Sequence, residues 1–275
     1  MINDNYIKKI SIDWDKVPSE SYLNSIYALK NIQYLNFDNR VTFFTGENGS
    51  GKSTLLEAIA VAYGFNPEGG TVNYNFSTYD DVSPLCDAVT VSKGFRRPKG
   101  SCFFRAESFF NVATKLEDYR DIIPKEVFYS RYGGKSLHEQ SHGESFLAFF
   151  QASEQDGIYI MDEPEAALSP QRQLTLLLEI QKMKEEGSQF IIVTHSPILL
   201  DLPNVDIYMF DENGIELCSY EDTDCYKIME MFINNRESFL KRLFACIYCL
   251  FFSLFFRIFL KNLLSIYPLI VFLKA

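Results

Sequence analysis

The stretch Gly46-Glu47-Asn48-Gly49-Ser50-Gly51-Lys52-Ser53, GENGSGKS, decides the fold of this chain. It follows residues 41–45, VTFFT, which are β-branched or aromatic and predict a strand. It runs into residues 52–63, KSTLLEAIAVAY, whose apolar spacing predicts a helix. The pattern G-x-x-x-x-G-K-[ST] between a strand and a helix is typical of a phosphate-binding loop, because its glycines let backbone N–H groups turn inward. The sequence therefore predicts a nucleotide site here.

The side chains of this loop have distinct expected roles. Lys52 would reach the β- and γ-phosphates, Ser53 would offer its hydroxyl to Mg²⁺, and Thr54 would bond the α-phosphate. The helix N-terminus adds a partial positive charge that favours anions. The predicted cofactors are ATP and Mg²⁺, and the expected nucleotide-binding residues of the loop are Asn48, Gly49, Ser50, Gly51, Lys52, Ser53 and Thr54.

Two later apolar strands deliver the other catalytic candidates. Asp162 and Glu163 directly follow the predicted strand at residues 158–161, IYIM. Open α/β sheets bind their ligands at the carboxyl ends of their strands. We expect Asp162 to hold Mg²⁺ through water and Glu163 to polarise the attacking water as general base. His195 follows the strand at 189–194, QFIIVT, and should contact the γ-phosphate or Glu163 at the same edge. The predicted catalytic residues are Glu163, His195 and Lys52, and the predicted metal ligands are Ser53 and Asp162.

Strands that are apolar on both faces and alternate with helices predict an α/β fold of the P-loop NTPase kind, with a mostly parallel sheet covered by helices. We further expect a small antiparallel β portion and a subdomain built on a helix near residue 145. Residues 66–135 are rich in Asn, Gly, Ser and Pro, and we expect them to lie outside the main sheet. The predicted domain is 1–240, with an insertion or subdomain at about 66–151. Residues 19–37 carry mixed signals and remain unassigned.

Residues 140–146, QSHGESF, allow two interpretations: a helix capped by Ser141, or a contact to phosphate. With these residues the chain resembles the ATP-binding-cassette ATPases over roughly residues 5–240, in the order GENGSGKST, QSHGES, IYIMDEPEAALS and VTHSP. The resemblance implies that Ser141, the backbone N–H of Gly143 and Glu144 bind the nucleotide held by another subunit. It thereby implies an ATP-induced, head-to-tail homodimer. Gln140 and His142 depart from the usual signature, which has leucine and glycine there.

The resemblance is narrower in some segments. RAESFFNVAT, YGGKSLHEQSHGESF and DEPEAALSPQRQL look like a compact bacterial group of AAA-type ATPases near the RecF/SMC and overcoming-lysogenization-defect-type branch. Ser169 stands where many cassette ATPases have aspartate. The glutamine that such ATPases place between the phosphate loop and the signature is missing, because no glutamine occurs between Gln33 and Gln140. Glu107 or Ser108 is the expected substitute.

Composition constrains the partners. The formal net charge of −10 argues against non-specific attraction to nucleic acid or to an anionic membrane, although the run 96–99, RRPK, remains a candidate basic patch. Six cysteines without a repeating spacing are typical of reduced thiols in a cytoplasmic protein. Cys246 and Cys249 form a CxxC without a second ligand pair, so a metal site there is not expected.

The hydrophobic tail at 241–275 has three interpretations. Residues 243–256 and 263–273 are apolar and interrupted by Arg257, which is borderline for a bilayer span of about 20 apolar residues. The tail is thus a membrane anchor through residues 243–273, a docking or dimerisation helix, or the product of a frameshift.

Three biological roles remain open from the sequence. The first is a soluble machine of DNA repair, DNA maintenance or phage defence. The second is the ATP-binding subunit of a membrane transporter, and the third is a nucleotide-dependent switch that regulates a protein partner.

Overall fold

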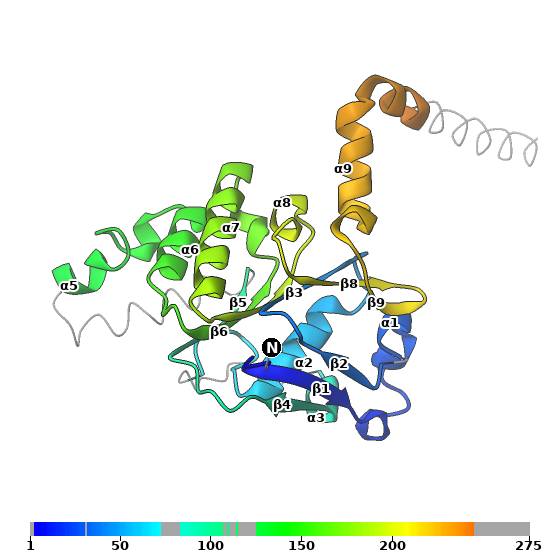
Figure 1. The fold of residues 1–275 in the computed structure, drawn as a ribbon, viewed down its shortest axis with the longest axis horizontal. Coiled ribbons are helices and arrows are strands. Elements are labelled where there is room, and N and C mark those ends of the chain that lie inside the picture. Colours follow the sequence, from blue (N-terminus) through cyan, green and yellow to red (C-terminus); the bar gives the residue numbers. More distant parts are fainter. Residues whose placement is uncertain are drawn as a thin grey trace, which may run out of the picture. The chain divides into compact units, whose positions relative to one another are not determined.

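The computed structural model describes residues 3–30, 32–72, 83–106, 109, 114 and 125–244. The chain divides into two compact units, Met1–Cys225 and Tyr226–Ala275. The first unit contains a six-stranded sheet, a three-stranded sheet and the helices that cover them (Figure 1).

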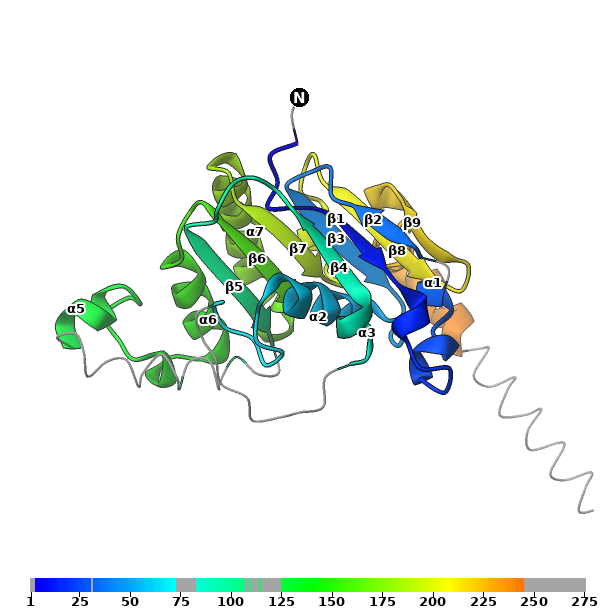
Figure 2. The ribbon, with the colours of Figure 1, turned by 90° about the horizontal axis from the view of Figure 1, so that it is seen from below.

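The larger sheet has the strand order β5-β6-β7-β3-β8-β9 (Figure 2). Neighbouring strands are parallel from β5 through β8, and only β9 is antiparallel to its neighbour. This confirms the predicted mostly parallel sheet. The strands are β3 (Val41–Gly46), β5 (Gly100–Arg105), β6 (Gly157–Asp162), β7 (Gln189–Val193), β8 (Asp206–Asp211) and β9 (Gly214–Leu217).

Helices cover both faces of this sheet because its strands are buried on both sides. In β6, Ile158 and Ile160 belong to the core on the side of α2 (Lys52–Tyr63), whereas Tyr159 and Met161 belong to the core on the opposite side. That second side is covered by α6 (His142–Gln151) and α7 (Pro170–Glu185) (Figure 1). The alternation follows from the two-residue period of a strand. It confirms the expected doubly covered sheet.

The smaller sheet is antiparallel, with the order β2-β1-β4, and this confirms the predicted small antiparallel portion. Its strands are β1 (Ile7–Ile12), β2 (Tyr34–Asn36) and β4 (Val89–Lys93). Ile7, Ile10 and Ile12 are buried in the same core as Leu55 and Ile59 of α2. The helix that follows the phosphate loop is therefore packed between two sheets.

One sequence-based expectation about the main sheet is wrong. Residues 66–135 do not all lie outside it, because β5 pairs in parallel with β6 over its full length. The strand was hard to predict because it begins with Gly-Ser and stands between polar segments. Cys102, Phe103 and Phe104 are nonetheless buried, on alternate sides.

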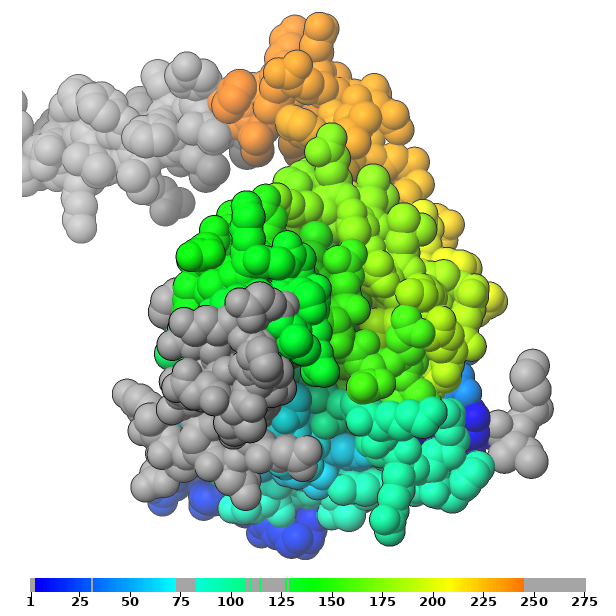
Figure 3. Space-filling model, turned by 90° about the vertical axis from the view of Figure 1, so that its left-hand side faces the viewer, coloured from blue at the N-terminus to red at the C-terminus, as the bar shows by residue number. Residues whose placement is uncertain are grey.

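The remaining elements are short. The helices are α1 (Tyr27–Lys30), α3 (Leu85–Ala88), α5 (Lys125–Ser130), α8 (Pro197–Leu200) and α9 (Asp224–Asn234). The 3-10 turns are η1 (Trp14–Lys16), η2 (Tyr22–Ser25), η4 (Leu137–Glu139), η5 (Pro164–Ala167) and η6 (Tyr220–Asp222). Figure 3 shows the face on which the green residues of α5 to α7 lie above the teal residues of β4 and β5.

The second unit is described as far as residue 244. Residues 236–244 are helical, and the Phe232 and Phe239 rings meet edge to face with centroids 6.0 Å apart. Within the described part of the chain, no helix combines the length and apolar character needed to cross a bilayer. Residues 245–275, with Cys246, Cys249 and most of the predicted hydrophobic tail, lie outside the described residues.

Candidate nucleotide-binding site

The phosphate loop begins and ends with glycines that no other residue could replace without strain. Gly46 has φ +134°, and a Cβ there would lie 2.1 Å from the carbonyl oxygen of Phe210 on the neighbouring strand β8. Gly51 has φ +91° at the N-cap of α2, and its Cβ would lie 2.8 Å from side-chain atoms of Ile26 and Leu29. The loop is therefore held between β8 and the residues around α1, which fixes the direction of its backbone N–H groups.

Lys52 folds back over this loop. Its Nζ donates to the carbonyl oxygens of Gly46 at 2.8 Å and of Glu47 at 2.6 Å, and the residue is buried. Burial lowers the pKa of Lys52, and the nearby carboxylates of Glu163 and Asp162 oppose that shift. The ammonium group is thus held in place at the loop before any anion arrives.

Ser53 and Asp162 meet at the predicted metal position. The Ser53 hydroxyl donates to Oδ1 of Asp162 at 2.8 Å, although the two residues are 109 positions apart. The first turn of α2 and the carboxyl end of β6 bring them together. A hydroxyl beside a carboxylate is an all-oxygen donor set, which is the chemistry that Mg²⁺ prefers. The residues present therefore fit the predicted ion.

Glu163 and His195 face each other across the same edge. Glu163 has φ +49°, which is uncommon for a residue with a side chain, and its Oε1 lies 3.9 Å from Nε2 of His195. Burial, reinforced by Lys52, lowers the pKa of His195, so its ring is neutral near neutral pH. Nε2 is buried and lacks a hydrogen-bond partner among the described residues. Such an atom fits a site that is completed by a bound phosphate or water.

A cavity of about 470 Å³ lies beside the phosphate loop, and its lining includes two residues that were not predicted, Tyr22 and Ile26, but neither Asp162 nor His195. Its other lining residues are Asn48, Gly49, Gly51, Lys52, Ser53, Thr54 and Glu163. The structure thus brings most of the predicted loop residues together with Glu163 around one space. Tyr22 lies in the segment that the sequence left unassigned, so no local pattern indicated it.

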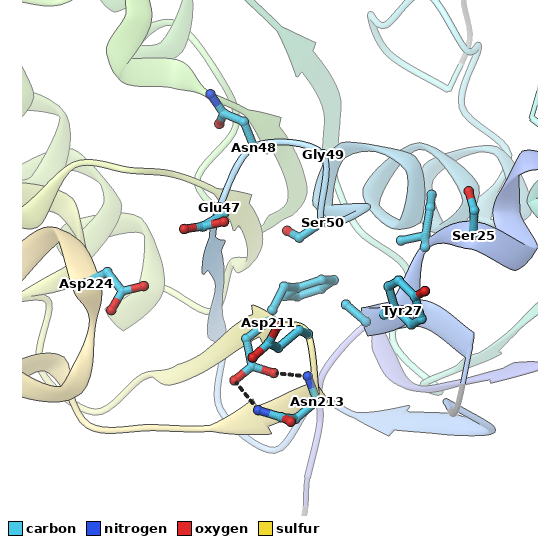
Figure 4. A pocket seen from close by; sticks show the side chains of 13 residues that line it. Ser25, Tyr27, Glu47, Asn48, Gly49, Ser50, Asp211, Asn213 and Asp224 are labelled. Atoms are coloured by element: carbon cyan, nitrogen blue, oxygen red, sulfur yellow. Dashed lines mark hydrogen bonds between the residues drawn. The ribbon is translucent and has the colours of Figure 1, made fainter. Parts of the chain in front are cut away.

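A second cavity of about 490 Å³ lies on the other side of the loop and includes Ser50 (Figure 4). Figure 4 shows Glu47 and Asn48 on one wall and Asp211 and Asn213, from the β8–β9 turn, on another. Its acidic side chains are Glu47, Asp211, Glu212 and Asp224. Four carboxylates disfavour a polyphosphate, so the cavity beside Lys52 is the better phosphate site.

The signature residues lie away from this cavity, at the start of α6. The backbone N–H and the hydroxyl of Ser141 both bond to Oε2 of Glu144, at 3.1 and 2.8 Å. Ser141 and Glu144 are exposed, whereas Gly143 packs closely against the carbonyl oxygen of Ala167. In this structure Ser141 is therefore a helix-capping residue, and its exposure leaves it accessible to another molecule.

Arg172 was missed by the sequence interpretation. Its guanidinium donates to Oε1 of Glu144 at 2.7 Å and to the Ser141 hydroxyl at 3.2 Å. The hydrogen bonds from Ser141, together with the Arg172 guanidinium, hold the pKa of Glu144 below its usual range. Arg172 lies 31 positions from Ser141 and 28 positions from Glu144, so a local motif could not reveal these contacts.

Arg105 is the second residue that the motifs did not indicate. It ends β5, pairs in register with Asp162, and donates to Oε2 of Glu57 at 2.7 Å. Its Nε also lies 3.9 Å from Oδ2 of Asp162. The carboxyl end of β5 was the available signal, because it reaches the same edge as β6. Glu107 and Ser108, the predicted substitutes for the missing glutamine, lie outside the described residues.

Most cations of the candidate basic patch at residues 96–99 form ion pairs within the molecule. Arg96 pairs with Asp4 at 3.2 Å and with Asp156 at 2.5 Å, and Lys99 lies 3.6 Å from Asp156. Asp156 directly precedes β6, so these ion pairs lie at the amino end of that strand. The phosphate loop lies at the opposite, carboxyl end of the sheet. Two of the three cations of this run therefore have internal partners.

Comparison with known proteins places these motifs in a family. A model described as "AAA domain" matches residues 22–137, and one described as "AAA domain, putative AbiEii toxin, Type IV TA system" matches residues 145–201. The energy-coupling factor transporter ATP-binding protein EcfA of Methanosphaera stadtmanae is 27% identical over 71% of this chain and 74% of its own length. The ribose import ATP-binding protein RbsA of Bacillus cereus is 24% identical over 61% of this chain and 37% of its own length.

Solved structures give weaker likenesses. The SMC head domain from Thermotoga maritima has a TM-score of 0.43 at 14% identity, covering 78% of this chain and 98% of that one. CbiO1 from Clostridium perfringens, part of an ABC transporter complex, has a TM-score of 0.45 at 17% identity, covering 85% and 97%.

A glycine-rich loop, a buried lysine and a serine–aspartate pair at the carboxyl edge of a parallel sheet define a P-loop nucleotide-binding protein. The two family models match the segments that carry these residues, 22–137 and 145–201. Both models describe AAA-type P-loop ATPase domains, and the chain is similar to ATP-binding proteins of the ABC type.

Proposed function

We propose that this protein binds ATP with Mg²⁺ and hydrolyses it. The observation that carries the proposal is the 2.8 Å hydrogen bond between Ser53 and Asp162, because it joins the phosphate loop to the carboxylate after β6. Glu163 and His195 lie at the same edge, 3.9 Å apart. Binding and hydrolysis thus have a common place in the fold.

Each residue has a chemical task in this proposal. The loop N–H groups from Asn48 to Thr54 and the Lys52 ammonium bind the phosphates. Ser53 and Asp162 hold Mg²⁺, which when bound neutralises charge on the transferred phosphoryl group. Glu163 accepts a proton from the attacking water. Neutral His195 can donate a hydrogen bond from Nε2 to Glu163 or to the γ-phosphate, because this atom has no partner among the described residues.

The proposed hydrolytic unit is a head-to-tail homodimer. Ser141 and Glu144 are exposed at the start of α6 and do not reach the loop of their own chain. The first turn of a helix leaves backbone N–H groups without partners, so the N–H of Gly143 can meet a phosphate held by a second copy. Arg172 adds positive charge beside Ser141.

The test uses two variants. Glu163→Gln should bind ATP but stop turnover, so that a dimer accumulates in saturating Mg·ATP and is measured by light scattering. Lys52→Ala should lose nucleotide affinity, measured by titration with a fluorescent ATP analogue. A Glu163→Gln protein that stays monomeric at saturation would falsify the head-to-tail homodimer, and wild-type protein without ATPase activity would overturn the proposed hydrolysis.

A second candidate role is the ATP-binding subunit of a transporter, because EcfA and other relatives carry that description. In that role the Glu163→Gln protein should co-purify with an integral membrane protein. DNA repair or phage defence stays a separate prediction, for which DNA-stimulated turnover is the measurement. The internal ion pairs of Arg96 and Lys99 leave less free positive charge at that run for DNA.

A further inference from the structure

The loop that carries His195 is fastened by the segment that follows β6. The backbone N–H of His195 donates to Oε1 of Glu165 at 2.6 Å, and Glu165 lies in η5. The Ser196 hydroxyl donates to Oε1 of Gln173 in α7 at 2.7 Å. The same hydroxyl accepts N–H bonds at the start of α8. The loop is thus tied to two elements that follow Glu163.

The buried carboxyl group of Glu165 is an unusual acceptor for a hydrogen bond that would serve the fold alone. Its Oε2 atom is buried, and the carboxyl group interacts with the Thr194 side chain as well as with the N–H of His195. Burial raises the pKa of Glu165, and hydrogen bonds from the N–H of His195 and from the Thr194 side chain oppose that shift. A buried carboxyl group costs stability unless hydrogen bonds compensate for its lost hydration, and the bonds of Glu165 go to the loop that carries His195.

The position of the bond suggests a different purpose. It fixes the backbone of His195, whose Nε2 is 3.9 Å from Oε1 of Glu163. Glu163 itself is anchored by its N–H, which donates to the carbonyl oxygen of Val193 at 3.0 Å. Two hydrogen bonds therefore join the same two segments of the chain, and each segment donates one. The segment after β6 carries Glu163 and Glu165, and the segment at the end of β7 carries Val193 and His195.

We propose that Glu165 is a positioning residue, which holds the backbone of His195 so that the imidazole faces Glu163. This inference rests on the proposed ATPase function. Positioning within an ångström affects the chemical step much more than it affects binding. Loss of the Glu165 bond should accordingly lower kcat and leave nucleotide affinity unchanged.

The experiment compares three variants of the full chain. Glu165→Ala removes the acceptor, Glu165→Gln keeps an amide oxygen that can accept the N–H, and Glu185→Ala removes an exposed carboxylate on α7 as a matched control. The readouts are kcat, the dissociation constant for ATP, and amide-hydrogen exchange of residues 190–200 followed by mass spectrometry. The exchange readout requires no turnover.

We expect Glu165→Ala to lower kcat about tenfold or more, which corresponds to about 1.4 kcal/mol of transition-state stabilisation. ATP affinity should stay within about twofold, and the His195 amide should exchange faster. Glu165→Gln should restore most of both losses, and Glu185→Ala should behave as wild type.

Two results would overturn the positioning role. One is a Glu165→Ala protein with wild-type kcat or an equally protected His195 amide. The other is a Glu165→Gln protein as impaired as Glu165→Ala. Wild-type protein that hydrolyses no ATP would instead overturn the proposed function, while the exchange comparison would still decide whether Glu165 holds the His195 backbone.

Discussion

Glu163 shows at the scale of one residue how the fold stores strain at its candidate site. Its φ of +49° costs on the order of 1 kcal/mol or more for a residue with a Cβ, and such strain gathers at functional sites. The N–H bond to Val193 and the following Pro164 hold this backbone conformation. The strained residue is also the predicted general base, which supports the assignment of its role.

His195 gives a pH prediction at the same scale. Burial and the Lys52 charge lower its pKa, so the ring should stay neutral until the pH falls below its ordinary value of 6.5. The acid limb of kcat should therefore lie below pH 6.5 in wild type. The same sign holds for stability, because the unfolded state takes up the proton first and the folded state loses stability as the pH falls.

The measurement is kcat between pH 5 and pH 9 for wild type and His195→Gln. The groups that face the imidazole are Lys52 and Glu163, and Glu165 faces its backbone. A limb that persists unchanged in His195→Gln would show that a group other than His195 produces it. A wild-type limb centred at or above pH 6.5 contradicts the prediction.

Arg105 links two elements, the edge strand β5 and the helix α2. Its guanidinium and the Glu57 carboxylate are 2.7 Å apart, with 22% and 16% of their side chains exposed. Removing one partner leaves a largely buried charge unpaired. We expect Arg105→Ala to lower the free energy of unfolding by on the order of 2 kcal/mol, discounted for the exposed fraction.

A double-mutant cycle with Glu57→Gln tests this link by urea unfolding. The double variant should be less destabilised than the sum of the two single variants, because neither charge is left alone. Strictly additive losses would show that the two side chains contribute independently. Lys16→Ala, which breaks only an exposed contact to Asp13 at 4.0 Å, provides the control.

At the scale of elements, local patterns predicted the main strands and the loop well. Helix 52–63 was predicted at its observed bounds, and strand 189–194 differs from β7 by one residue. These elements have continuous apolar runs that a short window can detect. β5 lacks such a run at its start, so it was expected outside the sheet. Its pairing with β6 depends on residues more than fifty positions away.

At the scale of the whole molecule, the motifs indicated which residues meet but not what holds them. The strand order brings Lys52, Asp162, Glu163 and His195 to one edge, as parallel strands require. The contacts of Glu165, Arg172 and Arg105 join residues across 28 to 57 positions, the first to a backbone N–H and the other two to side chains. No short pattern encodes such pairs, so they had to come from the structure.

The head-to-tail arrangement makes a quantitative prediction about mixtures of two inactive chains. Lys52→Ala disables the phosphate loop, and Ser141→Arg blocks the signature turn, so each homodimer should be inactive. In a mixed dimer, one site combines the mutated phosphate loop of one chain with the mutated signature turn of the other. The second site combines an intact loop with an intact signature turn. If the chains pair at random in a 1:1 mixture, half of the dimers have one active site of two, so turnover should recover to about a quarter of wild type.

The assay measures ATP hydrolysis by each variant alone and by the mixture at concentrations that support dimers. Lys52→Ala mixed with Glu163→Gln is the matched control, because both lesions affect the residues around one phosphate loop. In that mixture every site contains either Lys52→Ala or Glu163→Gln at its phosphate loop, so no recovery is expected. Recovery in the control, or none with Ser141→Arg, would show that Ser141 does not complete the site of a second copy.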